Sequence, residues 1–155
     1  IPYIEAGALH PRSAAANKVE LFKEIAQALD LDGDAVSEKA MLDALWKREL
    51  HQNTALADGA AITALVVPGL GTAQLGVFTL AKPIDYRSVR SLSVDVILAV
   101  LAPPELRNEQ LWLTERLSDM LRHTDVVAAL RMADSEQALS DALEAAESTV
   151  EAMGL

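Results

Sequence analysis

A continuous aliphatic run at residues 94–102, Val-Asp-Val-Ile-Leu-Ala-Val-Leu-Ala, is the feature that most constrains the fold. It shows little of the apolar–polar alternation expected of a strand with one face in water, and it ends at Pro103 and Pro104. Such a run is typical of a strand buried on both faces, which requires helices above and below the sheet. Residues 61–67 form a similar run that ends at Pro68 and predict a second buried strand.

The first half of the chain adds two helices and a third strand. Ser13 is the expected cap of a first helix, and residues 36–47 predict a second helix that packs on it as a hairpin. Residues 74–80 predict a strand, and residues 82–86 predict a turn after it. The apolar residues at three- and four-residue steps are Val19, Phe22, Ile25, Ala26 and Leu29 in the first helix, and Val36, Met41, Leu42, Leu45 and Trp46 in the second.

The end of the chain is helical. Asn108 is the expected cap of one helix, Thr124 or Asp125 begins a short one, and Ser135 begins the last. The helical repeat places Leu111, Trp112, Leu117 and Leu121 toward the core. This order of elements predicts a single α/β domain over residues 1–155, in which helices flank both faces of a mixed β-sheet.

Composition excludes several kinds of function. Among the 155 residues, 23 acids and 13 bases give a formal charge of −10, which disfavours nucleic acid and anionic membranes as main partners. The absence of cysteine excludes thiolate nucleophiles and cysteine-ligated metal centres. No apolar run is long enough to span a membrane, no signal peptide is visible, and the three histidines lack the spacing of metal ligands. We therefore expect a soluble protein without a metal or another cofactor.

The segment that leads into the first predicted strand carries a recognisable pattern. Glu49 is followed seven positions later by Leu56 and then Ala57, and Ala61 and Ile62 follow after a short gap. This pattern resembles the signature of type-2 enzyme IIA domains of the phosphoenolpyruvate sugar phosphotransferase system. Segments 80–86, 94–98, 101–103, 108–111 and 130–135 continue the resemblance, which covers roughly residues 4–146. The short chain looks most like the nitrogen-regulatory branch of the family.

The resemblance implies a phosphoryl-transfer site that lacks its nucleophile. In the family, a histidine accepts a phosphoryl group, and a second histidine and an arginine stabilise the charge on its oxygens. The nucleophile position is Ala64 here, the proline before it is Thr63, and the second histidine position is Gln110. Arg48 is the retained arginine. Because a methyl group cannot carry phosphate, the resemblance implies a protein that acts by binding.

Two alternatives remain open at this point. His51, in the loop expected after Arg48, is a candidate relocated nucleophile, although a solvated loop histidine would fit the same position. Alternatively, Arg48, Thr54, Thr63 and Gln110 could hold a small anion, and the protein would be a ligand-binding module. Each of these residues also has an ordinary structural interpretation, such as an arginine at a helix end.

The family also implies partners and a cellular location. These are a histidine-phosphocarrier-type protein, and regulated transporters or sensor kinases, in the cytoplasm. The surface around Arg48 and Ala64 is the expected docking face. Exposed edges of the predicted sheet would in addition allow a homodimer.

Overall fold

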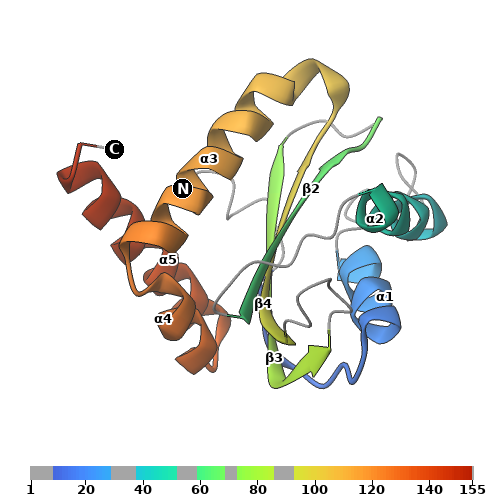
Figure 1. Cartoon of the computed structure of the whole chain (residues 1–155), viewed down its shortest axis with the longest axis horizontal. Helices are drawn as coiled ribbons and strands as arrows, with labels where there is room; N and C mark the ends of the chain where they lie inside the picture. Colours follow the sequence, from blue (N-terminus) through green and yellow to red (C-terminus); the bar gives the residue numbers. More distant parts are fainter. Residues whose placement is uncertain (1–8, 29–37, 52–58, 69–72, 86–92, 155) are drawn as a thin grey trace.

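The computed structural model describes residues 9–28, 38–51, 59–68, 73–85 and 93–154, and its helices lie in two layers on either side of one sheet (Figure 1). Helices α1 (Lys18–Ala28) and α2 (Glu38–His51) cover one face. Helices α3 (Arg107–His123), α4 (Val126–Met132) and α5 (Glu136–Ala152) cover the other. The predicted α/β class, with a mixed sheet flanked by helices, is confirmed.

The four strands run in the order β1-β3-β4-β2. Strand β1 (Leu9–Ser13) pairs in parallel with β3 (Gln74–Asp85), β3 pairs antiparallel with β4 (Ser93–Ala102), and β4 pairs in parallel with β2 (Ala60–Val66). Every residue of β4 after Ser93 is buried, as its unbroken aliphatic run predicts. The sequence pattern did not predict β1 as a strand, since its segment Leu-His-Pro-Arg-Ser shows no clear apolar alternation.

The first helix begins later than predicted. Asn17 caps α1, because its Oδ1 accepts a hydrogen bond from the Glu20 backbone N–H at 2.9 Å. Ser13 belongs to β1 instead, where its hydroxyl donates to a carboxylate oxygen of Glu24 at 2.6 Å. The expected inward position of Val19 is also wrong, since this side chain is exposed, whereas Phe22, Ile25 and Ala26 are buried.

Helices α1 and α2 pack as the predicted hairpin. The rings of Phe22 and Trp46 lie 4.7 Å apart between them, and Leu45 is fully buried beneath them. Both helices share a core with Ile97, Ala99 and Leu101 of β4. The predicted core residues Leu29 and Val36 lie outside the described residues.

A second core lies between the opposite face of the sheet and helices α3 to α5. Its largest contributors from the helices are Leu113, Leu117, Leu130, Leu139 and Leu143. Ser135 caps α5 as predicted, with its Oγ accepting from the Ala138 backbone N–H at 3.1 Å.

Helix α3 differs from its prediction at its start and on its outer face. It begins at Arg107 after a short 3-10 turn, so Asn108 lies inside the helix and is not its cap. Leu111 and Trp112 are exposed, because the buried stripe follows Gln110, Leu113, Leu117 and Met120. The predicted helical repeat is present, and Leu117 is buried as expected. The expected inward positions of Leu111 and Trp112 are wrong, because large apolar side chains can also lie on the exposed face of a helix.

Strand β3 contains a wide bulge where the sequence predicted a turn. Thr79 pairs with Val96 and Ile84 pairs with Val94, so residues 80–83 of β3 face the single residue Asp95 of β4. Lys82 and Pro83, which favoured a turn in the sequence, lie in this bulge, and the strand continues beyond it to Asp85. In the described part of the chain, no helix is long and apolar enough to cross a membrane.

Candidate functional site

Ala64 and Gln110, the positions of the two family histidines, come together where β2 and β4 approach their carboxyl ends. Ala64 pairs with Val100 across the two strands, and its methyl group packs in the core below α3. From α3, the Nε2 of Gln110 donates to the backbone carbonyl oxygens of Leu65 at 2.7 Å and of Val100 at 3.1 Å. The side chain of Gln110 therefore bridges β2 and β4 beside Ala64.

The bonding of Gln110 restricts its chemistry. The residue is only 5% exposed, and its amide nitrogen has two protons to donate. Both find backbone carbonyl oxygens, so neither proton is available to a phosphoryl oxygen or another anion near Ala64. The arrangement provides a hydrogen-bonded support for the sheet rather than a set of donors aimed at a ligand.

The other predicted site residues do not complete a polar pocket in the described structure. Thr63 is buried and precedes Ala64 in β2, so its side chain points to the opposite face of the sheet, toward α1 and α2. The predicted cluster of Thr63 with Gln110 is therefore wrong. Thr54 lies outside the described residues.

Arg48 and His51 both lie in the last turn of α2. His51 was expected in a loop, but it is the final residue of the helix. The structure describes the backbone of these two residues and not their side chains, so their roles at the site stay predictions.

Apolar side chains are exposed close to Ala64 and Gln110 in the chain. Val66, two residues after Ala64, is 39% exposed, and Leu111 and Trp112, next after Gln110, are 49% and 47% exposed. The guanidinium carbon of Arg116 lies 5.6 Å from the centre of the Trp112 ring. Exposed tryptophan and leucine are typical of surfaces that bind other proteins, and tryptophan and arginine are frequent among their strongest contacts.

A charged pair that sequence reasoning missed lies at the opposite end of the same strands. Asp95 is almost fully buried at the start of β4, and its two oxygens accept from the Nε and one terminal nitrogen of Arg131 of α4, at 2.5 and 2.9 Å. Gly59, just before β2, has φ of +82°, and a Cβ there would lie 2.8 Å from both partners. A single acid within the aliphatic run was the available sequence signal, since a buried carboxylate requires a cationic partner.

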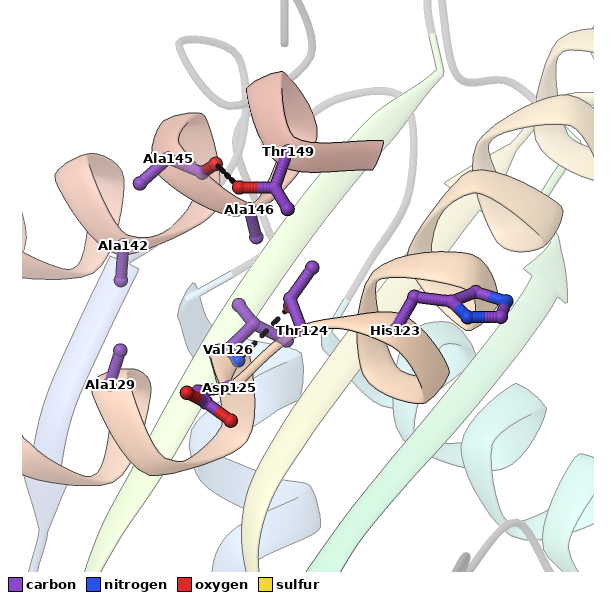
Figure 2. A pocket seen from close by; sticks show the side chains of 9 residues that line it. All are labelled: His123, Thr124, Asp125, Val126, Ala129, Ala142, Ala145, Ala146 and Thr149. Carbon is purple, nitrogen blue, oxygen red and sulfur yellow. Dashed lines mark hydrogen bonds between the residues drawn. The ribbon is translucent and has the colours of Figure 1, made fainter. Parts of the chain in front are cut away.

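A groove of about 360 Å³ between α4 and α5 is a second candidate site. Figure 2 shows the side chains that line it. Its floor consists of alanine methyl groups, and its threonines already bond within the protein. Thr149 donates to the Ala145 carbonyl oxygen at 3.0 Å, and Thr124 donates to that of Met120 at 2.6 Å. His123 ends α3, and its ring points away from the groove floor. Both threonine hydroxyls of the groove are therefore already used within the protein.

Among the residues that the structure describes, no three histidine or acidic side chains gather as metal ligands would. His10 of β1 stacks on Phe78 with ring centres 5.2 Å apart, and its Nδ1 is 3.9 Å from a carboxylate oxygen of Glu24. This is a structural contact of an edge strand, distant in the sheet from Ala64, which lies in the other edge strand.

Comparison with known proteins agrees with the fold. Residues 3–146 match the family described as phosphoenolpyruvate-dependent sugar phosphotransferase system, EIIA 2. The chain belongs to this family. It is 30% identical over 138 residues to a nitrogen regulatory protein of Bradyrhizobium diazoefficiens, with 88% of each chain covered. It is 25% identical over 123 residues to a nitrogen regulatory protein of Pseudomonas aeruginosa, covering 79% of this chain and 80% of the relative.

Solved structures show the same fold at lower identity. The nitrogen regulatory protein IIA-Ntr of Neisseria meningitidis superimposes with a TM-score of 0.82 at 19% identity, covering 92% of this chain and 99% of that one. The IIA mannitol domain of Escherichia coli superimposes with a TM-score of 0.70 at 15% identity, covering 87% and 94%. The predicted membership in the EIIA family and the likeness to its nitrogen-regulatory members are thus confirmed.

Proposed function

We propose that this nitrogen-regulatory EIIA-like chain, as one domain over residues 1–155, acts by binding partner proteins and does not carry a phosphoryl group. The observation that supports this is the pair at the two histidine positions. Ala64 presents a methyl group, and Gln110 donates both amide protons to backbone carbonyl oxygens. With a methyl group at position 64 and both amide protons of Gln110 already bonded, these two positions supply neither an acceptor for a phosphoryl group nor a donor to its oxygens.

The proposed docking surface is the exposed apolar group next to this pair, Val66, Leu111 and Trp112. A mannitol IIA domain of Escherichia coli with this fold has been solved in complex with phosphorylated IIB. By family resemblance, the partners proposed for this chain are a histidine-phosphocarrier-type protein and regulated transporters or sensor kinases, in the cytoplasm. A change of Trp112 to Glu should weaken such binding at least about tenfold, because it replaces the largest exposed apolar side chain of this group with a charged one.

Intact-mass measurement tests the proposal directly. The chain is incubated with phosphoenolpyruvate and the general phosphotransfer proteins, and we expect no phosphate-sized increase in mass. The Ala64→His/Gln110→His double variant should gain that increment and lose it on mild acid treatment, because it restores the two imidazoles on the same strand and helix. An acid-labile increment in the unchanged protein would overturn the proposal. A double variant that folds but stays unmodified would show that the docking surface does not receive the phosphocarrier.

The phosphocarrier alternative predicts a different outcome in the same experiment. If His51 is a relocated nucleophile, the unchanged protein gains the increment and His51→Ala abolishes it. His123→Ala is the matched control, since His123 ends another helix on the other side of the sheet. A homodimer formed through a sheet edge is read from the molar mass by light scattering, and it should not change either result.

A further inference from the structure

The cavity beside the β3 bulge is the feature that neither the family nor the proposed function explains. It has a volume of about 420 Å³ and lies between the β1–α1 connection and the bulged part of β3. Its lining residues are Ser13, Ala14, Ala15, Ala16, Ala81, Lys82, Pro83 and Ile84. This volume is within the usual range for sites that bind small molecules.

The fold explains why a cavity forms here. Strand β1 pairs with β3 only as far as Ser13 and Leu80, and the pairing of β3 with β4 is interrupted between Thr79 and Ile84. Residues 81–83 therefore pair with neither β1 nor β4. They form the wall of the cavity that lies opposite the β1–α1 connection. Bulges often occur next to binding sites, because they redirect side chains out of the regular sheet.

The lining is apolar apart from one charge. Ile84 is buried and Ala15 is half-buried, and both belong to the core below α1 and α2. The hydroxyl of Ser13 is already bonded, since it donates to Glu24 and accepts from the Ala15 backbone N–H at 3.1 Å. Lys82 is exposed in the wall, and no ion pair found among the described residues includes it. The ammonium group of Lys82 is therefore the polar group that a ligand would meet.

We propose that this cavity binds a small carboxylic acid with a short apolar chain. The chain of the ligand would cover Ile84, Ala15 and Pro83, and its carboxylate would pair with the Lys82 ammonium. A phosphate dianion fits less well, because it requires several donors and Lys82 is the only charged side chain among the described residues that line the cavity. The site lies on the α1–α2 face of the sheet, away from Ala64 and Gln110, so it is independent of the proposed function.

Titration of the full chain with butyrate, followed through its backbone amide NMR signals, tests the inference. We expect saturable shifts at residues 13–16 and 81–84, excluding Pro83, which has no amide proton. 1-Butanol and butylamine, which keep the chain and change the head group, should bind at least about fivefold more weakly, as expected for loss of one charge-assisted contact. Equal shifts with all three compounds, or butyrate shifts confined to other residues, would overturn the inference.

Two variants and one control locate the contact. Lys82→Met keeps a long apolar side chain and removes the charge, so butyrate should bind it about as weakly as 1-butanol binds the unchanged protein. Lys23→Met changes the net charge equally on the exposed side of α1, outside the cavity, and should bind butyrate normally. Ala14→Leu, at an exposed position, should fill the cavity and reduce the binding of butyrate and of 1-butanol. Equal butyrate binding by the Lys82 and Lys23 variants would contradict the role of Lys82.

Discussion

Near each end of strands β2 and β4, a side chain from the layer of α3 to α5 bonds to the sheet, and we call each of these contacts a brace. The two braces differ in kind. At the carboxyl ends, the neutral amide of Gln110 donates to two backbone carbonyls. At the amino ends, Arg131 holds the buried carboxylate of Asp95 with two hydrogen bonds, and Gly59 packs against both. In the family resemblance, only the first end is the site of chemistry. The charged brace is a buried ion pair, whereas the brace at the other end is a neutral amide.

The difference shows that the two ends of these strands place different demands on the side chains that contact them. A buried carboxylate must keep its cation, because an unpaired charge in the core costs several kcal/mol. A glutamine at the other end needs only acceptors, and backbone carbonyls supply them. Arg131 and Asp95 therefore have little freedom to change, whereas the position of Gln110 requires only a side chain that donates to the two carbonyls.

The charged brace should give the largest loss of stability. Arg131→Ala leaves the Asp95 carboxylate buried without its partner, and we expect the free energy of unfolding to fall by about 3 kcal/mol in urea denaturation. The control is Arg122→Ala, which breaks the exposed pair with Asp119 at 2.8 Å and should cost less than about 0.5 kcal/mol. Equal losses for the two variants would mean that the Asp95 pair contributes no more than a surface pair.

Gly59→Ala should have an intermediate effect. The methyl group would enter a left-handed backbone position and lie 2.8 Å from both members of the charged pair, so we expect a loss of about 2 kcal/mol. Gly154→Ala is the matched control, since its φ of +80° is similar but no atom lies within 4 Å of the added carbon. The difference between the two losses measures the contact with the pair, and it should become smaller in an Arg131→Ala background, where only the contact with Asp95 remains.

Gln110→Leu should give the smallest loss at either brace, about 1 to 2 kcal/mol. The change removes two hydrogen bonds and leaves the Leu65 and Val100 carbonyls without that donor. Thermal or urea unfolding measures the resulting loss of stability. Gln137→Leu, whose amide bonds Asp141 on the exposed face of α5, is expected to change stability by less than about 0.5 kcal/mol. A loss at Gln110 larger than that at Arg131 would reverse the ranking of the two braces.

Local patterns predicted most of the framework and failed where distant segments decide. The aliphatic run of β4 and the cap of α5 followed the sequence closely, since each depends on neighbouring residues. The turn expected from residue 82 was wrong, because β3 resumes its pairing with β4 at Ile84 and Asp85 after the bulge. Ser13 was expected to cap a helix and instead bonds Glu24 from an edge strand, which its own neighbours could not indicate.

The sequence by itself determined the family, the buried central strand, and the alanine and glutamine at the two histidine positions. These depend on residue identity and spacing, which the chain carries in linear form. Only the tertiary structure decided that the amide of Gln110 is consumed by β2 and β4, that Trp112 faces outward, and that Asp95 is paired with Arg131. Those facts depend on which segments meet across the sheet, and the packing of helices on strands fixes that order.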